Sequence, residues 1–213
     1  MENIAFKEKL AEYLLQIKAI QINVQNPFTW TSGWKSPVYC DNRKILSYPD
    51  VRTFVKEGFI GLINAYYPQV ECIAGVATAG IPHGAIIADA LNLPFIYVRS
   101  KAKEHGMGNT IEGSLLHGQQ VLVIEDTIST GGSSLKAVHD LREAGADILG
   151  MLAIYKYGFA STKKRFEDEG VQLKTLTNYD ILINAAIKQD DISSEDMETL
   201  KLWKQDPAEW HNS

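Results

Sequence analysis

The chain has 213 residues, of which 45% are hydrophobic and 22% are charged, and its net charge at pH 7 is −5. This composition suits one globular domain with its own core, and the negative charge argues against the broad basic surface of a nucleic-acid-binding domain. No run approaches the roughly 18 apolar residues of a membrane span, and the charge-interrupted N-terminus does not resemble a signal peptide. Two cysteines, Cys40 and Cys72, are too few for a disulfide framework and lack metal-binding spacing. We therefore expect a cytoplasmic protein that binds neither nucleic acid nor membranes.

Hydrophobic periodicity predicts an alternation of helices and buried strands along most of the chain. The N-terminal part is expected to contain a helix over 4–20, an irregular segment over 21–47 and a helix from Pro49–Asp50 to Tyr67. Strands are then expected over 70–77, 95–99, 121–126, 148–157 and 173–177, with helices between them over 82–91, 132–144 and 161–169 and a polar loop from the second strand to about 117. The tail is expected to be helical and opens with the capping-box-like SSED at Ser193. Short apolar runs separated by helices indicate an α/β fold with a doubly wound, mainly parallel sheet.

The segment VLVIEDTISTGGS (121–133) carries the strongest chemical signal. It places Glu125 and Asp126 at the carboxyl end of a predicted strand, where ligands of open parallel sheets bind. The loop that follows leads into a helix, so its free N–H groups and the helix dipole favour a bound phosphate. Hydroxyl groups and two glycines support the same reading, at Ser129, Thr130, Gly131, Gly132, Ser133 and Ser134.

Other interpretations of this segment are possible. Thr130 or Ser133 could merely cap the helix, with the acids as solvated strand-end residues. However, acids beside an anion site would repel a bare phosphate, so their presence favours a ligand that offers hydroxyls to the acids and a phosphate to the loop, as a sugar phosphate does. A nucleotide hydrolase is disfavoured because no GxxxxGK[ST] loop exists, and GMGN (106–109) lacks the third glycine of a dinucleotide-binding fingerprint.

VLVIEDTISTGGS resembles the phosphoribosyl-pyrophosphate motif of type I phosphoribosyltransferases. The resemblance implies that Glu125 and Asp126 hold the 2- and 3-hydroxyls of the ribose. The loop then holds the 5-phosphate through Thr127, Ile128, Ser129, Thr130, Gly131, Gly132 and Ser133.

The segment VRSKAKEHGMGN (98–109) is positively charged within a chain that is negative overall, which suits a polyanionic ligand. It resembles the mobile loop of orotate phosphoribosyltransferases. That resemblance implies that Arg99, Lys103 and His105 contact the pyrophosphate, and that the loop reaches the site of a neighbouring subunit. Lys101 adds a further positive charge, whereas Ser100 stands where many family members carry a second basic residue.

The segment TWTSGWKSPVYCDNRKILSYP (29–49) resembles the amino-terminal hood that covers the base in the same family, and GVATAGIPHG (75–84) resembles its pyrophosphate loop. The hood match implies base-binding roles for Lys35, Tyr39 and Cys40. Thr31 and Tyr157 depart from the family pattern, since some members carry a lysine and an arginine near these positions. Lys35, Arg43, the Tyr39–Cys40 backbone and Ser129 are the candidates for holding the carboxylate of orotate.

Together, these resemblances imply a single phosphoribosyltransferase domain over 1–213, with residues 1–48 forming the first helix and the hood. The implied reaction transfers the ribose 5-phosphate group of phosphoribosyl pyrophosphate to orotate and releases pyrophosphate, with Lys103, His105 and Asp126 as catalytic residues, in a homodimer with shared sites. Mg²⁺ is expected mainly on the phosphoribosyl pyrophosphate, without a dedicated metal site in the protein.

Two alternatives remain at this stage. The first is a phosphoribosyltransferase for a purine or another pyrimidine. The second is a ligand-sensing regulator with the same fold, which the length of the chain and its net charge of −5 disfavour because such a protein needs a basic face or an added DNA-binding helix pair.

Overall fold

The computed structural model describes residues 4–30, 32–101, 110–193 and 195–210. Its centre is a six-stranded sheet in the order β10-β9-β8-β5-β6-β7. The strands are β5 (Cys72–Val76), β6 (Phe95–Val98), β7 (Ile111–Glu112), β8 (Gln120–Ile128), β9 (Asp147–Lys156) and β10 (Leu173–Asn178). Neighbouring strands are parallel except β6 and β7, which are antiparallel. The predicted α/β fold with a mainly parallel sheet is therefore confirmed.

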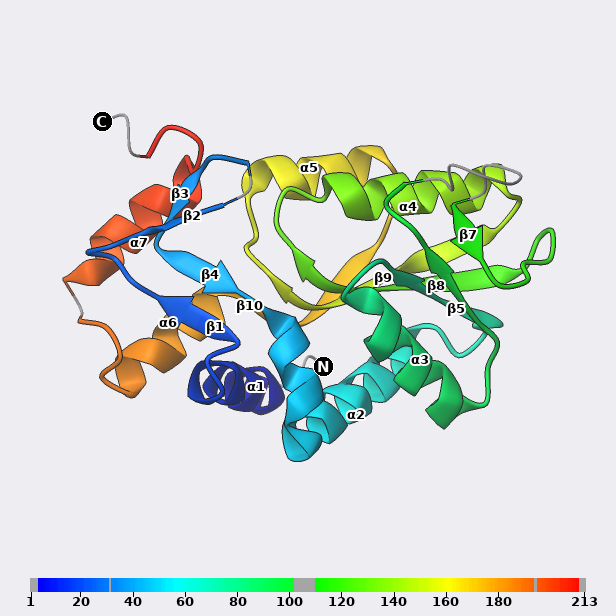
Figure 1. Ribbon diagram of the computed structural model, residues 1–213, viewed down its shortest axis with the longest axis horizontal. Helices are drawn as coiled ribbons and strands as arrows, with labels where there is room; N and C mark the ends of the chain where they lie inside the picture. The colour runs from blue at the N-terminus through cyan, green and yellow to red at the C-terminus, as the bar shows by residue number, and fades with distance from the viewer. Residues whose placement is uncertain (1–3, 31, 102–109, 194, 211–213) are drawn as a thin grey trace.

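Helices cover both faces of this sheet (Figure 1). They are α1 (Ile4–Gln16), α2 (Pro49–Tyr66), α3 (Gly80–Leu91), α4 (Gly132–Glu143), α5 (Ala160–Asp168), α6 (Tyr179–Lys188) and α7 (Asp196–Gln205). One buried cluster joins the sheet to α2 and α3 through residues such as Phe59 and Ile87, and a second joins it to α4 and α5 through Val138 and Phe166. Burial on both faces explains why the inner strands read as continuous apolar runs.

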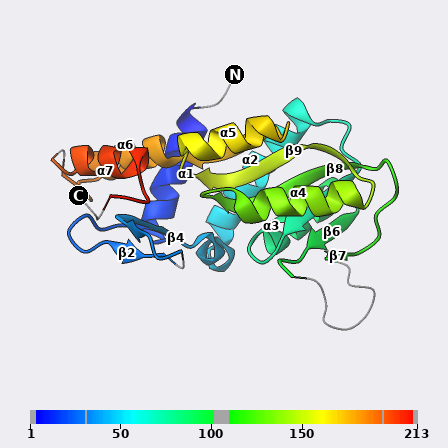
Figure 2. The same cartoon turned by 90° about the horizontal axis from the view of Figure 1, so that it is seen from above.

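A small lobe precedes the sheet domain and corresponds to the predicted hood. It contains the antiparallel pairs β1 (Ile20–Ile22) with β4 (Val38–Cys40) and β2 (Phe28–Thr29) with β3 (Lys35–Ser36), followed by the 3-10 helix η1 (Asn42–Ser47). Figure 2 shows these strands beside α6 and α7 at one end of the molecule. The hood is thus built from the beginning of the chain but lies against its end.

Several sequence predictions differ from the structure, and β7 lies within the segment that was predicted to be a polar loop. The first helix ends at Gln16 and not at 20, because Lys18 adopts a positive φ of 55° and Ile20 begins β1. The segment 21–47 is not irregular, but its strands have only two or three residues, too few to show an alternating pattern. Strand β8 continues to Ile128, two residues beyond the expected end.

The C-terminal region forms two helices. Helix α6 lies where no element was predicted. Helix α7 was expected, and Ser193 and Asp196 do form a reciprocal cap: the Ser193 N–H donates to the Asp196 carboxylate at 3.1 Å, and the Asp196 N–H donates to Ser193 Oγ at 3.2 Å. None of the described helices is long and apolar enough to cross a membrane.

Trp203 of α7 fastens the end of the chain to the hood. Its side chain is fully buried, and its indole Nε1–H donates to the backbone oxygen of Lys35 in β3 at 3.0 Å. Its ring packs edge-on against Trp30 of the hood at 5.9 Å and against Tyr157 at 5.7 Å. Aromatic pairs in this geometry add stabilisation beyond the area they bury. The hood is therefore held in place by residues more than 160 positions away in the chain.

We expect Trp203→Ala to lower the free energy of unfolding by about 3–5 kcal/mol, because it removes a large buried ring and leaves a cavity. Trp203→Phe should cost less, since it retains most of the packing and loses the hydrogen bond to Lys35. Urea denaturation followed by circular dichroism measures both changes. Leu202→Ala is the matched control on the same helix, because Leu202 is 52% exposed and should change stability by no more than about 0.5 kcal/mol. Equal effects of Trp203→Ala and Leu202→Ala would contradict the assigned role.

Candidate active site

The two predicted acids lie where β8 leaves one of its neighbours. On the β5 side, pairing ends at Ile124 with Gly75, whereas on the β9 side it continues to Ile128 with Lys156. Glu125 and Asp126 therefore lie beyond the sheet on one side while the other side still holds their backbone. This one-sided pairing keeps the carboxylates rigid and leaves room for a ligand beside them.

The environments of these two acids differ. Glu125 is buried, and its carboxylate accepts hydrogen bonds from the Ser134 hydroxyl and the Asp126 N–H, both at 3.0 Å. Asp126 is partly exposed, and its carboxylate accepts the Thr127 hydroxyl at 3.1 Å. Glu125 is thus the more enclosed of the pair, and Asp126 is the more accessible.

A cleft of about 320 Å³ brings segments of four different regions together. It is lined by Cys40, Asp41, Arg43, Ala77, Thr78, Ala79, Glu125, Asp126, Thr127 and Ser133. These residues come from the hood, from the turn between β5 and α3, from β8, and from the start of α4. The sequence predictions for Cys40, Glu125, Asp126, Thr127 and Ser133 therefore converge on one place.

The turn before α4 is held by its backbone conformation and by hydrogen bonds from α5. Gly131 has a φ of 76°, and a Cβ there would lie 2.7 Å from the Phe166 ring, so both backbone conformation and space require glycine. Helix α5 binds the carbonyl side of the turn: Thr162 Oγ1 donates to Ser129 O at 2.6 Å, and Arg165 Nη1 donates to Thr130 O at 3.1 Å. Because the first N–H groups of a helix have no partner within the helix, the turn is arranged to bind an anion.

The hood residues predicted to contact a base lie at different depths. Lys35 is exposed, and its Nζ donates to Thr29 Oγ1 at 2.7 Å. Tyr39 is 36% exposed, with its ring 5.5 Å from that of Phe28. Neither lines the cleft, and neither do the predicted loop residues Ile128, Ser129, Thr130, Gly131 and Gly132.

Arg43 is a candidate for holding the carboxylate, and Tyr157 stands near the position where some family members carry an arginine. The two side chains have opposite environments. Arg43 lines the cleft, and its Nε donates to Asp41 Oδ1 at 2.6 Å, an ion pair that lowers the pKa of Asp41. Tyr157 is buried, with its hydroxyl 3.5 Å from Val38 O and its ring stacked on Phe159 at 5.6 Å. Tyr157 therefore packs the hood against β9 and is not available to a ligand. Thr31 lies outside the described residues.

Only the first four residues of the predicted basic loop, 98–101, lie within the described part of the chain. Arg99 follows β6, and its Nη1 lies 3.4 Å from Glu112 Oε1 in β7, while Lys101 is exposed. Lys103 and His105 lie outside the described residues. The pairing of Arg99 with Glu112 partly neutralises the positive charge that the sequence placed there.

Sequence reasoning did not single out two buried polar residues behind the cleft, Asn42 and His83. Asn42 belongs to the hood pattern and is fully buried. His83 is also buried, and burial is the main reason why its pKa is lowered to about 4, so its ring is neutral at pH 7. Its Nε2 is buried without a hydrogen-bond partner among the described residues. Only their positions in the quoted motifs could have drawn attention to them.

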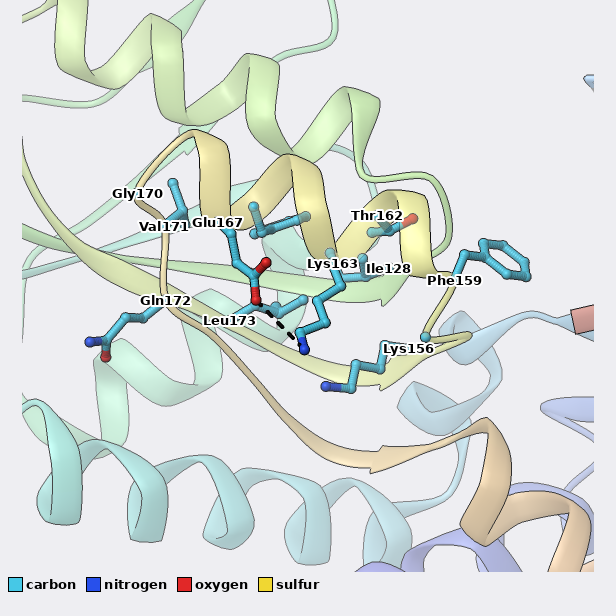
Figure 3. Close-up of a pocket in the computed structure, with 12 residues that line it drawn as sticks. Ile128, Lys156, Phe159, Thr162, Lys163, Glu167, Gly170, Val171, Gln172 and Leu173 are labelled. Carbon is cyan, nitrogen blue, oxygen red and sulfur yellow. Dashed lines mark ion pairs between the residues drawn. The ribbon is translucent and has the colours of Figure 1, made fainter. Parts of the chain in front are cut away.

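A larger hollow, of about 490 Å³, lies beside α5 (Figure 3). It is bounded by α5 and the neighbouring segments of β9 and β10, and Ile128 is the only predicted site residue in its lining. Its one drawn ion pair, Lys163 with Glu167 at 3.7 Å, is exposed and therefore weak. Chemistry, not size, identifies the smaller cleft as the candidate active site.

We expect Glu125→Gln to be more stable than the wild-type protein at about pH 7–8. Burial, followed by the charge of Asp126, raises the pKa of Glu125 well above its ordinary value of 4.5. As the pH rises above 4.5, Glu125 ionises more readily in the unfolded chain than in the folded protein, and this difference lowers the free energy of unfolding. The loss of stability disappears below about pH 4.5, where Glu125 is protonated in both states. Urea unfolding of both proteins between about pH 4 and 8 measures the difference, with the exposed Glu167→Gln as control. A difference that does not change with pH would contradict the assignment.

Comparison with known proteins agrees with this geometry. The family model described as "Phosphoribosyl transferase domain" matches residues 53–186. A Bacteroides fragilis protein named orotate phosphoribosyltransferase is 56% identical over 200 residues, covering 94% of this chain and 94% of its own. A Cytophaga hutchinsonii protein of the same name is 51% identical over 205 residues, covering 96% of this chain and 98% of its own.

Solved structures show the same fold. The crystal structure of orotate phosphoribosyltransferase from Aeropyrum pernix superposes with a TM-score of 0.75 at 26% identity, covering 86% of this chain and 99% of that one. The Leishmania donovani UMP synthase structure gives a TM-score of 0.79 at 24% identity, covering 93% of this chain, which spans only 42% of that protein. With the family model and near-full-length relatives in agreement, the chain belongs to the orotate phosphoribosyltransferases, within the type I phosphoribosyltransferase family.

Proposed function

We propose that this enzyme transfers the ribose 5-phosphate group of phosphoribosyl pyrophosphate to orotate, giving orotidine 5-phosphate and pyrophosphate in pyrimidine biosynthesis. The observation that carries the assignment is the cleft itself. It combines two carboxylates, the N-terminus of α4 and a hood in one space of about 320 Å³. A sugar phosphate that must be joined to a planar base needs these three features together.

The ribose lies between the acids and the turn. The carboxylates of Glu125 and Asp126 accept hydrogen bonds from its two hydroxyls, and such charge-assisted bonds are stronger than neutral ones. The 5-phosphate accepts the N–H groups of the turn over 129–133, whose carbonyl groups α5 already binds. The negative charge of Asp126 also lies where the anomeric carbon becomes positively charged as the pyrophosphate departs.

Departure of the pyrophosphate is assisted by positive charge. Arg99, Lys103 and His105 are assigned to the leaving oxygens, where they offset the charge that grows in the transition state. Closure of this loop excludes water, which could otherwise capture the ribosyl centre. The turn over 77–79, which lines the cleft opposite the acids, is assigned to the same leaving group.

Mg²⁺ fits this site as a companion of the substrate. Among the described residues, no three His, Cys, Asp or Glu side chains form a group that could hold a metal ion. Carboxylate oxygens are nevertheless the ligands that Mg²⁺ accepts, and it commonly binds through one or two of them together with substrate phosphates. Asp126, at the open side of the cleft, is the residue that would face such an ion. Bound there, Mg²⁺ would act as a Lewis acid and orient the pyrophosphate.

Orotate is assigned to the space under the hood. Arg43 is the cation that lines the cleft on this side, so we assign it to the orotate carboxylate, with Lys35, the Tyr39–Cys40 backbone and Ser129 as further candidates. The burial of Tyr157 supports this choice, since it removes the position at which some family members carry an arginine.

Two further assignments concern the setting of the enzyme. Cys40 and Cys72 are both free thiols, which suits the reducing cytoplasm. The basic loop is assigned to the active site of a second subunit in a homodimer, where symmetry would let each chain complete the site of the other. The whole chain over 1–213 acts as one domain, with residues 1–48 forming the first helix and the hood.

An assay of orotate consumption by ultraviolet absorbance tests the proposed function. Absorbance should fall only when phosphoribosyl pyrophosphate and Mg²⁺ are both present, because the ribosyl donor and its metal are needed together. Adenine, hypoxanthine and uracil serve as alternative bases under the same conditions. Turnover of one of these bases without turnover of orotate would overturn the assignment.

The shared site can be tested with hybrid dimers. Lys103→Ala and Asp126→Asn homodimers should each be nearly inactive, since every site carries a defect. If Lys103 acts on the neighbouring site, a hybrid of the two has one doubly defective and one intact site. Doubly tagged hybrids isolated after co-expression should therefore show about half of the wild-type activity, and a random mixture about a quarter. Verified hybrids without activity would show that Lys103 serves its own subunit.

A further inference from the structure

Asn42 lies at the point where the segments that form the active site meet. It is the first residue of η1 in the hood, it is fully buried, and it does not line the cleft. Its side-chain Nδ2 donates to the backbone oxygen of Asp126 at 3.2 Å and to Thr127 Oγ1 at 2.9 Å. On its other side, the imidazole of His83 in α3 hydrogen-bonds to the Asn42 backbone. One residue thus connects the hood to β8 and to the helix that follows the 77–79 turn.

The hydrogen bonds of Thr127 determine a direction for this connection. A hydroxyl group has one proton to donate and two lone pairs that accept. Asn42 Nδ2 can only donate, so Thr127 Oγ1 is the acceptor in that bond. The single proton of Thr127 is then directed to Asp126 Oδ2 at 3.1 Å, and Cys40, 3.3 Å away, is left to donate its S–H to the same oxygen. Thr127 accepts twice from the hood and donates once to Asp126.

We infer that Asn42 is a positioning residue that orients the carboxylate of Asp126 through the hydroxyl of Thr127. Because Asn42 belongs to the hood, the position of the hood and the orientation of the ribose-binding acid are coupled. This inference rests on the proposed function, since it assigns Asp126 to the ribose. It adds a residue that touches neither substrate.

The orientation of the Asn42 amide supports this inference. Both acceptors lie on the Nδ2 side, and a flipped amide would place Oδ1 against the Asp126 oxygen, so the network allows only one arrangement. Oδ1 is buried and has no hydrogen-bond partner among the described residues. Leaving a buried acceptor unsatisfied costs stability. Stability alone therefore does not explain why a buried amide stands at this position. The two hydrogen bonds that it donates to β8 do explain it.

Kinetics of variants along the chain of hydrogen bonds test the inference. Thr127→Val removes the hydroxyl at nearly constant shape, and we expect it to lower kcat/KM for phosphoribosyl pyrophosphate about tenfold or more, the size of effect of a lost bond to a charged group. Asn42→Ala should give a similar loss. Thr127→Ser retains the hydroxyl and should restore kcat/KM to within about threefold of the wild-type value.

A double-variant cycle separates positioning from general damage to the fold. If Asn42 acts through Thr127, kcat/KM of the Asn42→Ala/Thr127→Val protein should be close to that of the less active single variant. If the two residues act independently, the fold-losses of the two single variants should multiply. Thr177→Val is the matched control, because Thr177 is also a buried threonine whose hydroxyl donates a hydrogen bond, in this case to Lys7 O at 3.0 Å. Thr177 lies in β10 and does not line the cleft. It should leave kcat/KM for phosphoribosyl pyrophosphate unchanged. Thermal unfolding of each variant confirms that the folded state is being assayed.

The outcomes decide between the inference and the proposed function. A wild-type protein that does not consume orotate overturns the proposed function. An active wild-type protein with multiplicative losses, or with Thr127→Ser as impaired as Thr127→Val, overturns only the role of Asn42. If Asn42→Ala does not fold, the comparison of Thr127→Val with Thr127→Ser still tests the link to Asp126, and equal kcat/KM values for these two would refute it.

Discussion

Two adjacent carboxylates at the end of a buried strand are the constraint around which the structure is arranged. Charged groups resist leaving water, so each needs compensating partners. Glu125 receives the Ser134 hydroxyl and the Asp126 N–H, and Asp126 receives the Thr127 hydroxyl. The raised pKa of Glu125 shows that this compensation is incomplete. A ribose that donates its hydroxyls to both acids would supply what the protein alone does not.

The turn before α4 shows how tertiary contacts position a sequence motif. Glycine and hydroxyl residues permit the turn, but α5 determines which way it faces, because Thr162 and Arg165 bind its carbonyl oxygens. The first residues of α4 follow this turn, and Ser133 among them lines the cleft. A helix dipole favours an anion there as well. The motif and the helix that supports it lie about 30 residues apart.

The hood depends on contacts with α7 at the end of the chain and with β8 in its middle. Its strands are too short to be stable alone, since isolated two-stranded pairs are marginal in water. Trp203 hydrogen-bonds to the backbone of β3, and Asn42 connects η1 to the backbone of β8. A lobe held at these two points can be small and still have a defined position beside β8. Helix α7 therefore has a structural role, although its sequence carries no catalytic signal.

The sequence by itself determined the parallel α/β architecture, the carboxylate pair and the turn of glycine and hydroxyl residues that follows it. These features are local, because each is encoded by consecutive residues whose periodicity or turn chemistry is visible in a short window. Only the tertiary structure decided the short hood strands, the burial of Tyr157, the ties of Asn42 to β8 and the docking of Trp203. The burial of Tyr157, the ties of Asn42 and the docking of Trp203 depend on contacts between residues 80 or more positions apart, and these side chains obey no local periodicity. The hood strands pair over 20 positions or fewer, but they are too short to show an alternating pattern. Residue type alone could not distinguish a tyrosine that packs the hood from one that faces the ligand, because that difference is one of burial.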